Sequence, residues 1–252
     1  MSVAWAMYLD GNNFEGTLPS NLSGNLNVLD LHDNKLSGEL DASLWNLSPL
    51  QVLNVASNSL NGDIDPAICK LTNIQFLDLS NNNFSGSTPN CIGTLPLISL
   101  NLSWNSLSGY PGEFVKSSHI AALDLSYNQY MGDIEWVAYL YRMKLLLLGG
   151  NMFEGQIFSK LCHLRHLNII DLSHNKLTRV HCHCALVTFH LSMVHITHKF
   201  CPRSPIRYSF WRFLILWTMT ICPLCLPASM DSKASHSRLK GIFTHTVQNF
   251  SI

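Results

Sequence analysis

The stretch 77–103, LDLSNNNFSGSTPNCIGTLPLISLNLS, begins and ends on nearly the same phrase, because LDLS at 77–80 returns as LNLS at 100–103. Apolar and polar residues alternate within each phrase, which is typical of a short strand with one buried face. An Asn follows each phrase closely and a Gly comes four positions after it. The return of the whole pattern predicts a repeat protein.

The phrase occurs eight times before Arg179. Its second apolar residue, called the anchor below, recurs with a period of about 22–24 residues. The anchors are Leu9, Leu31, Val55, Leu79, Leu102, Leu125, Leu148 and Leu172. One short strand cannot bury enough apolar surface alone, so each copy must stack on the next. The spacing predicts a solenoid with one strand per repeat.

The third residue after each anchor is always Asn. An amide offers two donors and one acceptor, so it can satisfy backbone groups where the chain turns inward. We predict that these residues form a buried structural ladder, composed of Asn12, Asn34, Asn58, Asn82, Asn105, Asn128, Asn151 and Asn175.

Residues 5–178 resemble the plant extracellular type of leucine-rich repeat, LxxLxLxxNxLSGxIPxxLxxL. Phrases such as AICKLTNIQFLDLSNNNFSG (67–86) and KLCHLRHLNIIDLSHNKL (160–177) are similar to the ectodomain repeats of plant receptor-like proteins and receptor kinases. The resemblance implies an α/β solenoid, a right-handed arc with a parallel sheet on its concave face. It also implies a membrane-associated glycoprotein at the extracellular face of the plasma membrane, active in plant defence or developmental signal transduction.

By this resemblance, the chain would be a truncated recognition module that binds a peptide, a glycan or a co-receptor ectodomain. No kinase, signal peptide or paired-Cys cap is recognisable, so a separate kinase would have to signal and a longer gene would have to supply any membrane span. Uncapped repeats should be marginally stable and sticky. An intracellular interaction scaffold and a non-functional truncated product stay open as alternatives.

Outward positions of the predicted strands give the candidate ligand-binding residues Phe76, Asp78, Asn101, Trp104, Asp124 and Tyr127. Trp104 and Tyr127 should lie about 5 Å apart on neighbouring strands, and Phe76 should be exposed on the same side. Asp30, Asp78, Asp124 and Asp171 share one repeat position and should have equal environments, whereas acid–base catalysis needs unequal ones. We expect no enzyme, no cofactor, no metal and no nucleic-acid partner.

Two further residue types bear on secretion. N-x-S/T sequons in the repeats make Asn21, Asn83 and Asn101 candidate glycosylation sites. Cys69, Cys91 and Cys162 precede the anchors of their repeats by ten or eleven positions. We expect them to be small buried hydrophobes and not disulfide partners, because the repeats place them in separate layers.

The composition changes at Arg179. Residues 1–179 hold 15 acidic and 9 basic residues, whereas residues 180–252 hold 1 acidic and 7 basic. No anchor recurs at the place near 195 where the period would put it, so we expect no further repeat. A sharp shift of this kind predicts that residues 180–252 form a poorly ordered basic tail, or a segment derived from an intron or a frameshift. Two alternatives stay open. One is a membrane span at 213–226, although this apolar run is shorter than the usual twenty residues or so. The other is a zinc site, with the candidate donors His181, Cys182, His183, Cys184, His195, His198, Cys201, Cys222 and Cys225.

Overall fold

The computed structural model describes residues 5–18, 22, 25–116, 119–157, 159–180 and 193–195 of the 252-residue chain. At positions 115, 159, 162, 179, 180 and 193–195 it describes the backbone but not the side chains. The expectations for Asn21, for Cys162, and for the zinc donors and apolar run after Arg179 therefore lie outside the described residues or side chains.

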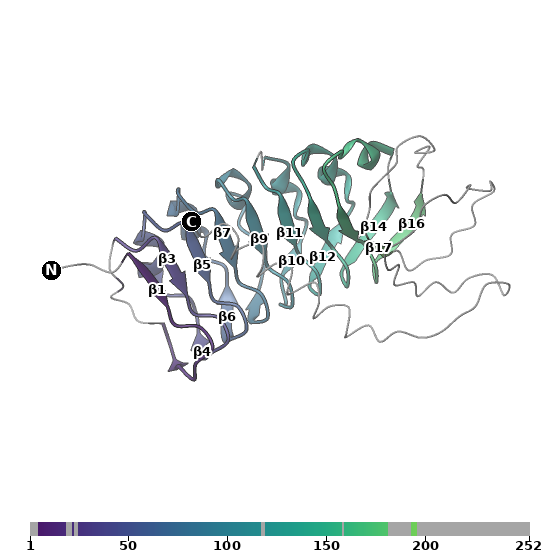
Figure 1. Ribbon diagram of the computed structural model, residues 1–252. Helices are drawn as coiled ribbons and strands as arrows, with labels where there is room; N and C mark the ends of the chain where they lie inside the picture. Colours follow the sequence, from purple (N-terminus) through teal and green to yellow (C-terminus); the bar gives the residue numbers. More distant parts are fainter. Residues whose placement is uncertain are drawn as a thin grey trace.

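The main sheet contains nine parallel strands whose spatial order follows the chain (Figure 1). Each strand takes the central residues of one phrase, and equivalent residues pair in register, as Leu53, Leu77 and Leu100 do. The predicted solenoid with a parallel sheet is thus confirmed. Its strands are β1 (Ala6–Tyr8), β3 (Val28–Asp30), β5 (Val52–Asn54), β7 (Phe76–Asp78), β9 (Ser99–Asn101), β11 (Ala122–Asp124), β13 (Leu145–Leu147), β15 (Ile169–Asp171) and β17 (Met193–His195).

Two smaller parallel sheets follow the Asn turns. One comprises β2 (Glu15–Gly16), β4 (Lys35–Gly38), β6 (Ser59–Asp63) and β8 (Asn83–Ser85). The other comprises β10 (Ser108–Gly109), β12 (Gln129–Gly132), β14 (Met152–Ile157) and β16 (Lys176–Val180).

Short 3₁₀ helices complete the repeats on the side away from the main sheet (Figure 1). They are η1 (Ala42–Asn46), η2 (Pro66–Lys70), η3 (Ile92–Thr94), η4 (Gly112–Lys116), η5 (Glu135–Tyr139) and η6 (Ser159–His163). In the part of the chain that the structure describes, no helix is long and apolar enough to cross a bilayer.

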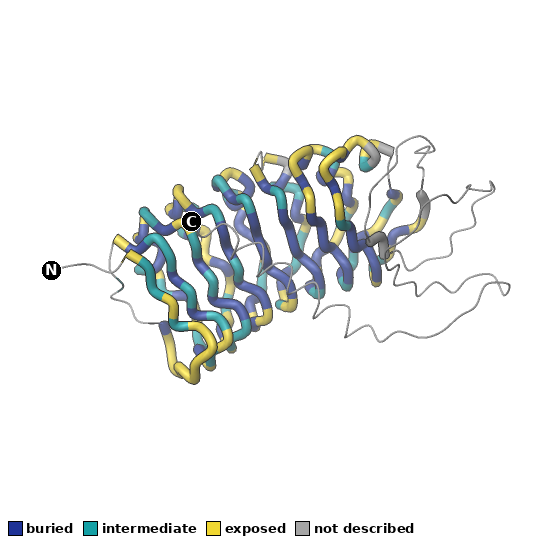
Figure 2. The backbone as a smooth tube through the Cα atoms, viewed as in Figure 1, coloured by how far each residue is buried: buried dark blue, intermediate teal, exposed yellow. Residues whose placement is uncertain are grey.

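One continuous apolar core runs the length of the solenoid between the main sheet and the 3₁₀ helices. Seven of the eight anchors are buried, and Leu9 in the first repeat is partly buried. Bulky residues such as Trp45, Phe84 and Phe114 are fully buried in this core, and buried segments recur in every layer along the solenoid (Figure 2). Full burial of one such side chain contributes about 1.5–3 kcal/mol, so each layer depends on its neighbours for most of its stability.

The regular spacing of Asn produces a hydrogen-bonded ladder between repeats. The Asn128 Nδ2 donates to the carbonyl of Leu102 in the preceding repeat at 2.8 Å, and to the carbonyls of Leu125 and Ser126 at 3.3 Å. Its Oδ1 accepts from the backbone N–H of Leu107 at 2.9 Å. The same four-contact pattern occurs at Asn34, Asn58, Asn82, Asn105, Asn151 and Asn175.

Asn12 differs from the other members of the column. It is exposed, and its Nδ2 donates within its own repeat, to the carbonyls of Leu9 and Asp10. The prediction of a buried ladder is confirmed for Asn82, Asn128 and Asn151, whereas Asn34, Asn58, Asn105 and Asn175 are half-buried. It is wrong for Asn12, where no preceding layer is present among the described residues to cover the side chain.

Cys69 and Cys91 form a disulfide between consecutive repeats, contrary to the expectation of unpaired buried thiols. Cys69 lies in η2 and Cys91 directly precedes η3, with 6.0 Å between their Cα atoms. The expectation failed because it treated separate layers as distant. Adjacent layers are only about 5 Å apart, which is within the Cα separation of a disulfide.

The main sheet also continues past Arg179, which corrects the expectation that no strand recurs near 195. β17 pairs in parallel with β15, with Ile170 opposite Val194. The sequence carried this signal weakly, since Val194 and Ile196 repeat the apolar spacing of Ile170 and Leu172 one period later. The absence of Asn and Gly after them concealed it.

Removing one inner Asn should destabilise the solenoid far more than removing the terminal one. Asn128→Ala leaves buried backbone donors and acceptors unpaired, so the free energy of unfolding should fall by about 2 kcal/mol or more. Asn12→Ala, on the exposed first repeat, should change it by less than about 0.5 kcal/mol. Urea denaturation of both variants measures this, and equal losses would contradict the ladder's role.

Loss of the disulfide should weaken the outer side of the solenoid. Replacing Cys69 and Cys91 together by Ser should lower the free energy of unfolding by about 3 kcal/mol, because it releases a 22-residue loop. A reductant should lower the stability of the parent protein by a similar amount and leave the double variant unchanged. Peptide mapping without reduction should recover residues 69 and 91 linked, and recovery of both as free thiols would refute the pairing.

Candidate functional site

The concave face is lined by the outward side chains of the main strands. Eight of these strands have described side chains, and six of the eight end on an acidic or amide residue. These residues are Asp30, Asn54, Asp78, Asn101, Asp124 and Asp171. Each accepts the N–H of the residue two positions later at its Oδ1, as Asp124 does from Ser126 at 2.9 Å. The residues of this polar row therefore have a structural role, because they accept backbone hydrogen bonds at the ends of the strands. They also face the concave side.

Three of the predicted ligand-binding residues are less accessible than expected. The exposed fractions of Phe76, Asn101 and Asp124 are 8%, 4% and 6%. The expectation that Phe76 is exposed is thus wrong, because neighbouring strands pack against an outward side chain on a sheet this closely spaced. Asp78 is partly exposed and lies beside Asn101, whose Nδ2 donates to its Oδ2 at 3.1 Å.

The structure separates the two candidate glycosylation sites that it describes. Asn83 is exposed on β8. Asn101 is buried, and both ends of its amide are hydrogen-bonded, Nδ2 to Asp78 and Oδ1 to the N–H and hydroxyl of Ser103. The expectation of a glycan at Asn101 does not fit this fold, whereas the one at Asn83 stays a prediction.

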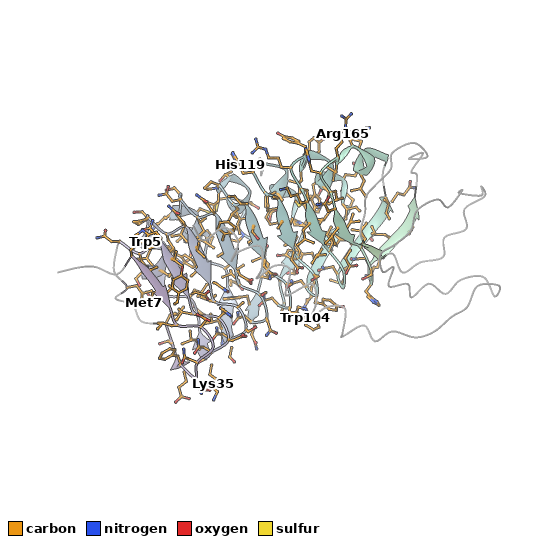
Figure 3. The ribbon with its side chains drawn as sticks, viewed as in Figure 1. Trp5, Met7, Lys35, Trp104, His119 and Arg165 are labelled. Carbon is orange, nitrogen blue, oxygen red and sulfur yellow. A yellow bond between two sulfur atoms is a disulfide. The ribbon has the colours of Figure 1, made fainter. Side chains whose placement is uncertain are left out.

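Trp104 and Tyr127 form an aromatic pair at the edge of the concave face. Their ring centroids are 4.1 Å apart with an interplanar angle of 13°, so the rings stack. Trp104 is 40% exposed and lies on the long edge of the solenoid opposite His119 and Arg165 (Figure 3). Gly150, in the next repeat, leaves room for the pair, because a Cβ there would lie 2.9 Å from the Cδ1 atom of Tyr127.

The backbone beneath this pair is in an uncommon conformation. Trp104 and Tyr127 have φ values of +57° and +53°. Other repeats mostly place smaller or more tolerant residues in this left-handed region at the same position: Gly11, Asp33, Ser57, Asn81, Gly150 and His174. Left-handed backbone costs a bulky residue about 1–2 kcal/mol, and such strain concentrates at ligand-binding sites.

A small buried apolar cluster on the main strands near the pair in sequence was not predicted. Ala122, Leu145 and Leu147 form a cluster separate from the main core, with Ile169 packed against it. The run LLLL at 145–148 was the available signal, since apolar residues there occupy both outward and inward positions. The sequence-based prediction gave weight to aromatic and polar residues only.

The carboxylates of the polar row have unequal environments. Burial raises the pKa of Asp124 to about 7, and hydrogen bonds from Ser126 and the nearby negative charges of Asp78 and Asp171 act in opposite directions on it. Burial also raises the pKa of Asp78, which accepts hydrogen bonds from Ser80 and Asn101. The expected equality fails because Asp124 has apolar Leu147 beside it, on β13, where Asp78 has Asn101.

The raised pKa of Asp124 should make stability pH-dependent. Between about pH 4 and pH 7 the folded state retains a proton that the unfolded state has released, so the free energy of unfolding should fall as pH rises through this window, by at most about 1.4 kcal/mol per unit. Asp124→Asn should remove the part of this slope that Asp124 contributes, while the raised pKa of Asp78 still contributes its own part. Asn fits the position, because Asn101 already makes the equivalent bonds to Ser103.

Urea denaturation of parent and variant at pH 5 to 8 tests this effect of Asp124. The variant should gain stability over the parent as pH rises. A difference that is constant across this range would show that Asp124 ionises normally in the folded protein.

Comparison with known proteins agrees with this geometry. Residues 25–47, 49–71 and 73–95 match the Leucine Rich Repeat family. Comparison with curated protein sequences finds no match.

Many solved structures are similar to this chain, among them the following three. The ectodomain of the Arabidopsis thaliana receptor kinase GASSHO1/SCHENGEN3, in complex with CASPARIAN STRIP INTEGRITY FACTOR 2, shares 30% identity and a TM-score of 0.63 over 68% of this chain and 24% of its own. The PEPR1–AtPEP1 structure has 30% identity and a TM-score of 0.69, and the match covers 77% of this chain and 29% of the PEPR1–AtPEP1 chain. The structure of the Arabidopsis receptor kinase HAESA, with the peptide hormone IDA and the co-receptor SERK1, has 29% identity and a TM-score of 0.65. The match covers 74% of this chain and 33% of the HAESA chain.

The chain thus spans between 24% and 33% of the lengths of these structures. GASSHO1/SCHENGEN3 and HAESA are both described as receptor kinases. Together with the parallel sheet, the Asn ladder and the family match, these likenesses show that the chain is a leucine-rich-repeat protein, with repeats similar to part of a plant receptor kinase ectodomain.

Proposed function

We propose that the concave face from β9 to β15 binds an extended peptide. The observation that carries this proposal is the Trp104–Tyr127 pair, stacked at the edge of the sheet on left-handed backbone. The fold does not require aromatic residues there, because Asn81 and Ser57 occupy the same turn in other repeats. Two bulky residues kept in a costly conformation suit a binding role better than a structural one.

The chemistry of this surface fits a peptide with both apolar and polar groups. The exposed Trp104, stacked on Tyr127, offers contact for apolar side chains, and aromatic anchors dominate many protein interfaces. The partly exposed Asp78 lies farther along the polar row, toward the N-terminal repeats. The peptide hormone bound to HAESA supports the same ligand class for this chain.

The partners and location follow as parts of this proposal. HAESA is seen with both a peptide and a co-receptor, which supports a co-receptor ectodomain as a second partner here, with a separate kinase carrying the signal. We infer a glycosylated protein at the extracellular face of the plasma membrane, acting in defence or developmental signalling. The Cys69–Cys91 disulfide supports this location over an intracellular scaffold, because structural disulfides persist in oxidising compartments.

Removal of the aromatic pair should abolish binding without loss of folding. Peptides selected on the parent protein from a phage-displayed random dodecapeptide library should bind Trp104→Asn or Tyr127→Asn at least about tenfold more weakly, a loss of about 1.4 kcal/mol. Each variant should unfold at the same urea concentration as the parent or a higher one, because Asn tolerates the left-handed turn.

Tyr141→Asn serves as the matched control, because Tyr141 is an exposed aromatic residue following η5, away from the main sheet. Its peptide binding should equal that of the parent. Unchanged binding in both edge variants, or equal loss in the control, would sink the assignment of the site.

A further inference from the structure

A second cluster of functional groups lies at the other end of the concave face. Asp10, Asp30 and His32 each offer one potential metal ligand, and the three ligand atoms lie within 4.8 Å of one another. The cluster belongs to the repeats of β1 and β3, whereas the aromatic pair belongs to those of β9 and β11. It is therefore separate from the proposed peptide site.

The parallel register brings these residues together. Asp10 and His32 each directly follow the anchor of their repeat, and Tyr8 pairs with Asp30, so Asp10 and His32 are neighbours across two strands. Backbone hydrogen bonds from Leu9 to Asp30 at 2.8 Å and from Gly11 to His32 at 2.9 Å continue that pairing. Asp30 and His32 share a face because they are two positions apart in an extended segment.

The imidazole of His32 is an addition that the fold does not need. The equivalent position in later repeats holds a small residue: Ala56, Ser80, Ser103, Ser126, Gly149 and Ser173. The turn itself is kept, because the His32 N–H still donates to Asp30 Oδ1 at 3.2 Å, as the N–H of Ser126 does to Asp124. His32 therefore adds a ligand without changing the scaffold.

The ring of His32 lies between two carboxylates. Its Nδ1 lies 2.6 Å from Asp30 Oδ1, a separation that requires a proton between them, and the ring nitrogen supplies it. Nδ1 also lies 3.2 Å from Asn54 Nδ2, and Nε2 lies 4.0 Å from Asp33 Oδ2. Both ring nitrogens thus have a carboxylate nearby: Asp30 lies within hydrogen-bond distance of Nδ1, and Asp33 lies 4.0 Å from Nε2.

We propose that Asp10, Asp30 and His32 bind a divalent transition-metal ion of the Zn²⁺ class, with water completing the coordination and the exposed Asp33 available as a further ligand. An imidazole among carboxylates favours such ions over Ca²⁺ and Mg²⁺, which prefer all-oxygen sites. Zinc needs ligand atoms about 2.0–2.2 Å from the ion, so the cluster must contract. Asp10 is exposed and can rotate inward.

The bound ion would join two layers of the solenoid. Asp10 comes from the first repeat, and Asp30 and His32 come from the second, so coordination would hold the outermost described strand to its neighbour.

Equilibrium dialysis of the full chain with Zn²⁺ in the presence of excess Ca²⁺ tests the site. His32→Ser and Asp10→Asn should each bind one zinc ion fewer per chain than the parent. His32→Ser should fold normally, since Ser occupies this position in four other repeats. Circular dichroism confirms folding, and the comparison between chains removes the contribution of His and Cys residues elsewhere.

His166→Ser is the matched control, because His166 is an exposed histidine far along the chain, just before β15. Its zinc stoichiometry should equal that of the parent. Equal stoichiometry in all four proteins would overturn the proposal, as would displacement by Ca²⁺ of the ion that depends on His32.

Discussion

The amide of the inner Asn residues is the interaction on which the rest of the structure depends. In one side chain it satisfies two carbonyls of its own turn, one carbonyl of the preceding repeat and one N–H of the preceding repeat's second strand, as Asn82 shows. Without it, the tight turn into the core would leave buried polar groups unpaired. Because the bond set spans two layers, the Asn side chain also sets how successive repeats stack.

Because the buried anchors and the Asn residues hold the layers together, the outward positions of the strands are available for functional residues. Anchors and Asn residues define the layers, so a residue such as His32 can replace Ser, and Trp104 can replace Asn, with the backbone course retained. The two replacements act differently. His32 adds a ligating group at no evident backbone cost, whereas Trp104 and Tyr127 hold aromatic rings on left-handed backbone. Strain of that kind is a better guide to a recognition surface than exposure alone.

Periodicity predicted the strands, their register and the inner ladder, because each rests on residue types that recur at fixed spacing. It could not predict properties that depend on contacts between layers. The Cys69–Cys91 bond needed the layer spacing, and the burial of Phe76 and Asn101 needed the side chains of adjacent strands. The Leu145–Leu147 cluster and the Asp10–Asp30–His32 cluster each join residues from different repeats or faces. Strand β17 was missed because its phrase lacks the Asn that marks the others.

The central claim is that recognition occurs at the aromatic edge of the concave sheet. Hydrogen–deuterium exchange of the full chain, with and without a saturating selected peptide, tests this most directly. The account predicts slower exchange in segments 99–105, 122–128 and 145–151, with segments 28–34 and 52–58 unchanged. Slower exchange confined to the N-terminal repeats or to the 3₁₀ helices, with the aromatic edge unaffected, would contradict it.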